Sequence, residues 1–202
     1  MCPTMTALTG ESGAVIISST RQLSRRSSPA APMVLSLPCT VNGNYKTDLT
    51  DAVPLSVCSG VKTAQGWHFA AAGDAEYTVE ELRADPGADT ACAVLRCRFA
   101  DGQTVEERYT VEKSGVTVQL KGEGPLALAL PAFAFDGEVH PDIEWTPDIL
   151  TVACRGWRCR YTAENAVLTD TGRMAANRNG HYRAFAAVGS DTLTVHIEIE
   201  KA

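Results

Sequence analysis

Residues 90–124, TACAVLRCRFADGQTVEERYTVEKSGVTVQLKGEG, decide the fold of this chain. Apolar and polar side chains alternate there in three runs: Ala91–Phe99, Gln103–Lys113 and Val116–Lys121. Two residue pairs typical of turns, Asp101-Gly102 and Ser114-Gly115, separate these runs. The pattern predicts a meander of three antiparallel strands.

The register of the first turn follows from the apolar face, because a slip of one residue would turn that face toward water. A two-residue loop would mix the apolar and polar faces. A three-residue loop, 100–102, instead places Cys97 opposite Val105 and Arg96 opposite Glu106. We therefore predict the three-residue loop, closed by a glycine in the left-handed conformation.

For the second turn, we predict a two-residue Ser114-Gly115 loop. It places Val111 opposite Val118 and Tyr109 opposite Leu120. With both turns formed in this way, the meander has one continuous apolar face.

Glu107 interrupts that face, because it lies between Val105 and Tyr109 and opposite Leu95. A buried carboxyl group is costly unless it is paired or hydrogen-bonded. Glu107 is therefore expected near a sheet edge, bonded to a partner, or facing a cleft as a site carboxylate.

Composition and charge exclude several classes of protein. The 202 residues are 45% hydrophobic and 21% charged, values that predict a globular domain rather than disorder. The formal net charge of −6 argues against nucleic-acid binding, which needs clustered Lys and Arg. No apolar run approaches the roughly 20 residues that span a bilayer, so no membrane partner is predicted.

Seven cysteines, an odd number without the dense spacing of a disulfide framework, predict free thiols. Cys92 and Cys97 are expected on opposite faces of one strand, where a single metal ion could not easily bind both. The thiols and the lack of a secretory signal at the start favour a reducing, cytoplasmic setting. No cofactor is predicted.

The rest of the chain also favours strands. Leu126–Phe135 is apolar on both faces, which is typical of a central strand covered on each side. Ile149–Cys154 and Trp157–Thr162 predict a hairpin through Arg155-Gly156, followed by a polar loop at Asp170–Gly180. Further elements are predicted as follows: strands at Ala14–Ser19, Met33–Leu37, Val53–Val57 and Gly66–Ala71, a mobile Arg/Ser/Pro loop near 21–32, and strands at Tyr182–Val188 and Thr192–Glu200 joined by a Gly189-Ser190-Asp191 turn.

These runs predict an all-β fold with little or no helix. The fold class expected is an antiparallel β-sandwich of about twelve strands, supersandwich-like, with residues 1–202 as a single domain.

Residues 136–148 (DGEVHPDIEWTPD) hold five acids and no Lys or Arg. His140, Asp142 and Glu144 would project from one side of an extended chain and could bind a divalent cation or serve as acid and base. The same alternation is typical of a solvated strand face. The prolines at 141 and 147 confine the segment to an edge or a loop.

Other candidates are residues able to contact a sugar ring. Aromatic faces stack on sugars, and neighbouring polar groups hydrogen-bond the hydroxyls. His181 lies in a polar loop and could also act in catalysis. The candidates for substrate binding are Trp67, Trp145, Trp157, Arg178, His181 and Tyr182.

The closing pattern of the chain resembles a known class of domain. Asn179-Gly180-His181-Tyr182, a strand, the Gly-Ser-Asp turn and a final Leu-x-Val-x-Ile-x-Ile strand look like the C-terminal β-sandwich domains of bacterial polysaccharide lyases, heparinase II/III-like, and related carbohydrate-active enzymes. The resemblance implies a chain that is the C-terminal part of a longer protein and packs against a helical catalytic domain. No catalytic residue is carried over by it.

Three functions are therefore considered. The first is an accessory or carbohydrate-interacting module of a polysaccharide-processing protein, with a glycan as partner. The second is a free-standing lyase or mutarotase-like enzyme that uses His140 or His181 with Glu107 or Glu144 as acid and base. The third is a structural or assembly domain that pairs through exposed strand edges.

Overall fold

The computed structural model describes residues 5–6, 18–19, 57–64, 66–70, 77–86, 90–112, 114–135, 137–177 and 180–202, and these form strands but no helix. The strands are β1 (Met5–Thr6), β2 (Ser18–Ser19), β3 (Ser59–Thr63), β4 (Gly66–Phe69), β5 (Tyr77–Pro86), β6 (Ala91–Phe99), β7 (Thr104–Val111), β8 (Gly115–Gly122), β9 (Leu126–Phe135), β10 (Asp142–Trp145), β11 (Ile149–Cys154), β12 (Trp157–Asn177) and β13 (Gly180–Lys201). The strand predicted at 33–37 and the loop predicted near 21–32 lie outside the described residues.

Eleven strands are hydrogen-bonded into one sheet, and β1 and β2 form a separate pair. The main path runs β10-β11-β12-β13-β8-β7-β6-β5, while β9 pairs with β13 and β3, and β3 also pairs with β4. Every pairing is antiparallel. The predicted all-β antiparallel class is thus confirmed. The sandwich of about twelve strands stays a prediction.

The first turn of the meander has the predicted register. Cys97 lies opposite Val105 and Arg96 opposite Glu106. The Phe99 amide donates to the Gln103 carbonyl at 2.8 Å, which closes the three-residue loop. Gly102 has a φ of 88°, the left-handed conformation that glycine adopts without steric cost.

The predicted register of the second turn is wrong by two residues. Val111 lies opposite Val116 rather than Val118, and Tyr109 opposite Val118 rather than Leu120. The Glu112 amide donates to the Gly115 carbonyl at 2.9 Å, and Gly115 belongs to β8 rather than to the loop. A shift of two residues keeps each side chain on its face, so alternation alone could not detect it.

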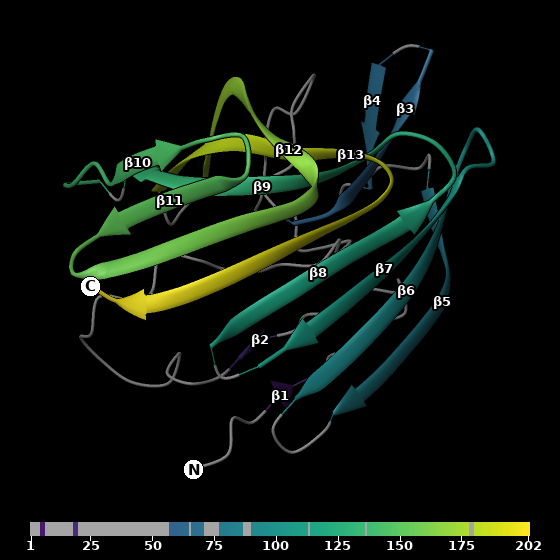
Figure 1. Cartoon of the computed structure of the whole chain (residues 1–202), viewed down its shortest axis with the longest axis horizontal. Coiled ribbons are helices and arrows are strands. Elements are labelled where there is room, and N and C mark those ends of the chain that lie inside the picture. The colour runs from purple at the N-terminus through teal and green to yellow at the C-terminus, as the bar shows by residue number, and fades with distance from the viewer. Residues whose placement is uncertain are drawn as a thin grey trace.

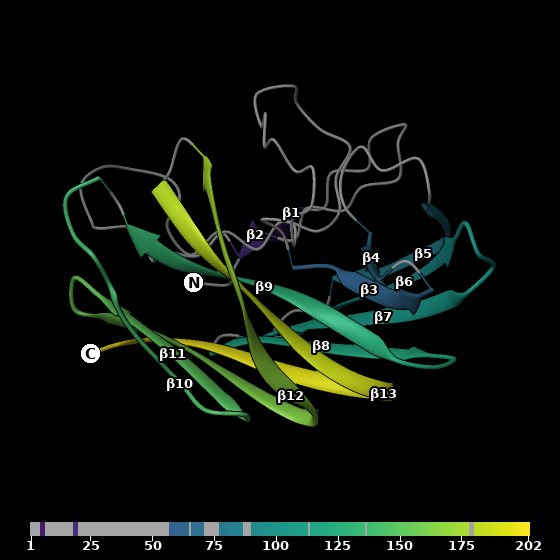
Figure 2. The ribbon, with the colours of Figure 1, turned by 90° about the horizontal axis from the view of Figure 1, so that it is seen from above.

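β9 is a central strand, as predicted. Nine of its ten residues are buried, and it pairs with β13 on one edge and β3 on the other. Figure 2 shows β9 and β3 on one side of β7 and β8. We call β9, β3 and β4 the β9 limb and β5–β8, which lie side by side in Figure 1, the meander limb.

The segment from 157 to 201 differs from the prediction. Residues 170–177, predicted as a loop, continue β12, which pairs with β13 up to Asn177 opposite Gly180. The polar side chains there serve a bulge between Asp170 and Arg173 instead of a loop. The Gly172 amide donates to Asp170 Oδ1 at 3.0 Å, and the Arg173 amide to Thr171 Oγ1 at 3.4 Å.

The turn predicted at Gly189-Ser190-Asp191 is also absent, because β13 is continuous there. This triplet marks the point where β13 changes its neighbour on one edge. Residues 181–189 pair with β9, and residues 192–198 pair with β8. The sheet therefore divides at Gly189 into the two limbs.

The hairpin between β11 and β12 is confirmed, with Cys154 opposite Trp157. Arg155 and Gly156 have φ values of 48° and 76°. Positive φ at both central residues is typical of the type I′ turn, whose twist matches that of the flanking strands.

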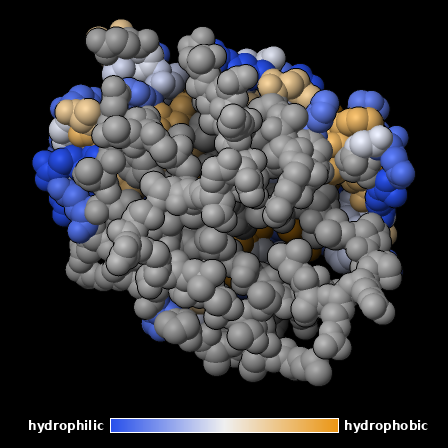
Figure 3. Space-filling view, turned by 180° about the vertical axis from the view of Figure 1, so that it is seen from behind, coloured by the Kyte–Doolittle hydropathy of each residue, from blue (hydrophilic) through white to orange (hydrophobic). Residues whose placement is uncertain are grey.

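The core is formed by both limbs together with β11, β12 and β13. Its largest fully buried side chains come from β6, β7, β8, β9, β11, β12 and β13: Leu95, Tyr109, Leu120, Leu126, Leu128, Leu130, Leu150, Tyr161, Leu168, Phe185, Leu193 and Ile197. At the margins of the face in Figure 3, the described residues are mainly hydrophilic, with smaller apolar areas among them. In the described part of the chain no helix is long and apolar enough to span a membrane.

The change of neighbour at Gly189 gives a testable prediction. A Cβ atom there would lie 2.6 Å from the Asn165 carbonyl oxygen, closer than side chains pack. We expect Gly189→Ala to lower the free energy of unfolding by about 1–3 kcal/mol, the usual cost of overpacking. Urea denaturation measures this loss. Ser190→Ala, at the exposed neighbour, is the control and should stay within about 0.5 kcal/mol of the wild type; an equal loss in both variants would contradict the steric explanation.

Candidate functional site

The predicted site residues do not form a single site, and Glu107 lies apart from the other candidates in the core. Its side chain is 0% exposed and lies opposite Leu95, as predicted. Ser59 of β3 donates its hydroxyl to Oε1, and the Tyr109 hydroxyl donates to Oε2 at 2.6 Å. The Cys97 thiol lies 3.8 Å from Oε1. Of the three situations considered for this carboxyl group, the structure shows bonding to partners.

Burial raises the pKa of Glu107, and the hydrogen bonds from Ser59 and Tyr109 oppose that rise. Burial and the neighbouring Glu107 also raise the pKa of Tyr109 and of the Cys97 thiol. The group is fully enclosed, and its partners in the described part of the chain, Ser59, Cys97 and Tyr109, include no histidine. In this structure, Glu107 therefore joins β7 to β3 across the core and does not form an acid and base pair with His140 or His181.

Some of the other candidates lie where β10 and the far half of the β12–β13 hairpin meet the end of β9. Paired residues of adjacent strands point to the same face. His181, Arg183 and Phe185 alternate along β13, with Met174 opposite Arg183 and Asp170 opposite Phe185. We call the following residues the rim cluster: Phe135, His140, Trp145, Asp170, Met174, His181, Arg183 and Phe185.

Two candidate histidines meet at Phe135 in this cluster. The His140 ring stacks on the Phe135 ring with centroids 4.5 Å apart, and the His181 ring meets it edge to face at 5.5 Å. Both histidines are exposed. His140 Nδ1 lies 3.3 Å from the Ala134 carbonyl oxygen, which fixes the ring beside β9.

Trp145 and Arg183 both contact the ring of Phe185. The Trp145 ring meets it edge to face with centroids 5.9 Å apart. The Arg183 Cζ atom lies 5.5 Å from its centroid, within the range of a cation–π interaction. Phe185 is 0% exposed and Trp145 is 45% exposed. A buried ring thus supports an exposed one.

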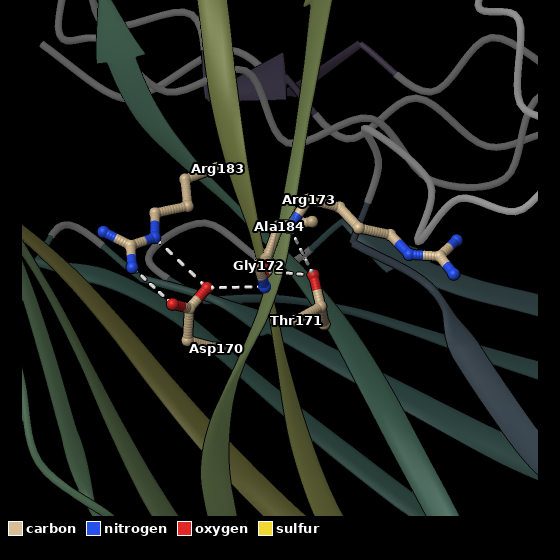
Figure 4. Close-up of polar contacts among 6 residues, drawn as sticks. All are labelled: Asp170, Thr171, Gly172, Arg173, Arg183 and Ala184. Atoms are coloured by element: carbon tan, nitrogen blue, oxygen red, sulfur yellow. Dashed lines mark hydrogen bonds and ion pairs between the residues drawn. The ribbon is translucent and has the colours of Figure 1, made fainter.

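Asp170 holds the guanidinium of Arg183 through two hydrogen bonds (Figure 4). Nε donates to Oδ1 at 3.1 Å, and Nη2 donates to Oδ2. These bonds from Arg183, and the Gly172 amide, lower the pKa of Asp170. The same pairing raises the pKa of Arg183. The bulge at 170–173 therefore fixes a carboxylate and a guanidinium near Phe185, the ring that Trp145 also contacts.

The remaining candidates for sugar contact lie elsewhere. Trp67 is half-buried on β4 with the Lys62 amine 5.3 Å from its ring centroid, and Trp157 is half-buried at the start of β12. Tyr182 is buried and packs edge to face on Phe133, with centroids 5.4 Å apart. Arg178 lies outside the described residues.

His140, Asp142 and Glu144 are exposed. Asp142 and Glu144 are alternate residues of β10, on the face away from Trp145, whereas His140 lies against Phe135. Among the described residues, no group of three His, Cys, Asp or Glu side chains could hold a metal ion.

The sequence did not identify Phe135, Asp170, Met174, Arg183 and Phe185 as members of one site. The sequence predicts a loop for Asp170, a covered central strand for Phe135 and a strand for Phe185. The only available signal was the alternation His181, Arg183, Phe185, which places three chemically capable side chains on one face.

Comparisons with known proteins give a weak resemblance. No family model and no curated protein matches the chain. Among solved structures, heparan sulfate lyase HepC from Pedobacter heparinus matches with a TM-score of 0.46, and a mutant of it with 0.45, each at 11% sequence identity. The matches cover 62% of this chain and 22% of the lyase chain. The chain thus spans about a fifth of the lyase, and this is the kind of protein that the sequence resembled.

Glu107 gives a prediction on pH. Its pKa in the folded state is raised above the ordinary 4.5, so folding favours the protonated form. Its contribution to stability is complete below that ordinary value and is lost as the pH rises through the folded pKa. We expect the wild type to lose free energy of unfolding relative to Glu107→Gln as the pH rises from about 4, by up to about 1.4 kcal/mol per pH unit.

Urea denaturation of both proteins over a series of pH values measures this difference. Glu106→Gln, at the exposed neighbouring position, is the control and should not remove the pH dependence. A constant difference between the wild type and Glu107→Gln across the series would show that folding does not shift the pKa of this carboxyl group, which would contradict the prediction.

Proposed function

We propose that this chain is a carbohydrate-interacting module of a polysaccharide-processing protein and that the rim cluster is its sugar-binding surface. The observation that carries the proposal is the exposed Trp145 ring supported by the buried Phe185 ring. Indole faces stack on the apolar faces of sugar rings, and a rigid support lowers the entropy lost on binding.

Polar groups beside this ring support the same proposal. Arg183 also contacts Phe185, and Asp170 holds its guanidinium in place. A sugar ring stacked on Trp145 would have hydrogen-bond donors and acceptors within its reach. Sites that bind small polar ligands typically have a small number of polar groups in fixed orientations next to an aromatic surface.

Binding to a glycan array, followed by calorimetry on any glycan that binds, tests this proposal. We expect Trp145→Ala to weaken binding at least about tenfold, which is about 1.4 kcal/mol. Val167→Ala is the matched control, because Val167 is 55% exposed on the opposite face of the same hairpin and should leave binding unchanged. Trp67→Ala tests whether Trp67, another tryptophan predicted to contact a sugar, contributes to binding. No binding by the wild type, or equal binding by Trp145→Ala, would refute the proposal.

A second candidate function rests on a different observation, the meeting of His140 and His181 at Phe135. A free-standing lyase or mutarotase-like enzyme needs a general base beside its sugar, and histidine is the commonest such group. The exposed Glu144 lies on β10 close to His140 in sequence, whereas the enclosed Glu107 has no access to a substrate.

An assay of unsaturated uronate absorbance over a panel of acidic polysaccharides, together with a mutarotation assay, tests this candidate. If the chain is an enzyme, His140→Ala or His181→Ala should reduce kcat at least a hundredfold, the typical contribution of a general base. The half-buried His196 on β13 provides the control variant His196→Ala, which should retain activity. Absence of activity, or activity indifferent to both substitutions, counts against the enzyme.

A further inference from the structure

The charges of the rim cluster bear on the kind of sugar it could bind. With histidine counted as neutral, Arg183 and Asp170 are its charged members, and their formal charges cancel. The side chains are 39% and 15% exposed, so the pair is accessible mainly from the guanidinium side. The cluster therefore has strong hydrogen-bonding groups but no net positive charge.

The hydrogen bonds within the pair leave further donors available. A guanidinium carries five N–H groups, and Arg183 uses two of them on Asp170. Nη1 remains free of this pairing. Asp170 Oδ1 accepts from both Arg183 and the Gly172 amide, so its orientation is fixed before any ligand arrives. Fixed donors beside an acceptor match the neighbouring hydroxyl groups of a pyranose ring.

The surroundings add negative charge. The segment that carries His140 and Trp145, residues 137–148, contains four acids and no Lys or Arg. One of the four, Glu138, is paired with Arg155 at 2.9 Å. Arg173, the nearest other cation along β12, lies opposite Ala184 and extends to the other side of the hairpin (Figure 4). A polyanion approaching Trp145 would therefore meet repulsion over about one Debye length, roughly 10 Å at 0.1 M salt.

We infer that the rim cluster is specific for neutral sugars, with a pyranose ring on Trp145 and its hydroxyls on the Arg183–Asp170 pair. The inference rests on the proposed carbohydrate binding and adds the substrate class to it. Met174, 57% exposed opposite Arg183, extends the apolar surface on which such a ring would lie. Polysaccharides that carry carboxylates or sulfates are disfavoured because Asp170 already neutralises the guanidinium.

Two substitutions within the pair test this specificity in opposite directions. Asp170→Asn removes the negative charge and frees the guanidinium. We expect it to weaken binding of neutral oligosaccharides at least tenfold and to strengthen binding of oligogalacturonate at least fivefold at 50 mM NaCl. Arg183→Gln removes the donors and should weaken neutral binding without any gain for oligogalacturonate. Calorimetry with cello-, manno- and xylo-oligosaccharides and with oligogalacturonate measures both effects, and thermal unfolding checks that each variant is folded.

The possible outcomes separate this inference from the proposed function. One outcome supports both the inference and the proposed function. In it, the wild type binds neutral oligosaccharides with an affinity that does not change between 50 and 300 mM NaCl, and Asp170→Asn weakens that binding and strengthens binding of oligogalacturonate. Binding of oligogalacturonate in preference to the neutral sugars, weakened by salt and by Trp145→Ala, overturns the inference and keeps the proposed function. Absence of binding to every oligosaccharide overturns both.

Discussion

β13 is hydrogen-bonded along both of its edges, and this double pairing determines the arrangement of the other strands. β12 covers one edge for most of its length, while β9 and then β8 cover the other. The change from β9 to β8 occurs at Gly189, where the Asn165 carbonyl oxygen approaches closely and a Cβ atom would not fit. One strand is therefore paired with both limbs. The rim cluster lies at the N-terminal end of β13, where that strand pairs with β12 and β9.

Two polar contacts connect strands through the core: one joins the two limbs, and the other joins β12 to the β9 limb. Glu107 on β7 accepts a hydrogen bond from Ser59 on β3, and the Tyr161 hydroxyl on β12 donates to the Pro131 carbonyl on β9 at 3.3 Å. Enclosing a carboxyl group is costly, and the cost falls when each oxygen has a partner. No enclosed side-chain polar atom lacks a partner among the described residues. Because a displaced β3 would leave Glu107 without Ser59, the buried group favours one relative position of the two limbs.

The sequence was sufficient to predict the structure where a local constraint alone determined it. The first turn of the meander was predictable because Gly102 tolerates a positive φ and only a three-residue loop kept the apolar face intact. The second turn was not, because two registers that differ by two residues give the same faces. Residues 170–177 have the composition of a loop, yet the side chains of Asp170 and Thr171 bind backbone amides within a strand. Long-range pairing with β13 outweighs that composition.

The candidate site could be predicted only in part, because its members come from four strands and a connection. His140, Trp145 and His181 were chosen for their chemistry, but nothing local indicates that Phe135 separates the histidines or that Phe185 supports the tryptophan. Arg183 and Asp170 illustrate the same dependence, since they are 13 residues apart and meet because β12 and β13 pair across a bulge. That bulge adds the Gly172 amide to Asp170, so the backbone itself orients the carboxylate. A site held by strand pairing and main-chain hydrogen bonds is ordered before binding, and a ligand there would lose little free energy to reorganisation of the protein.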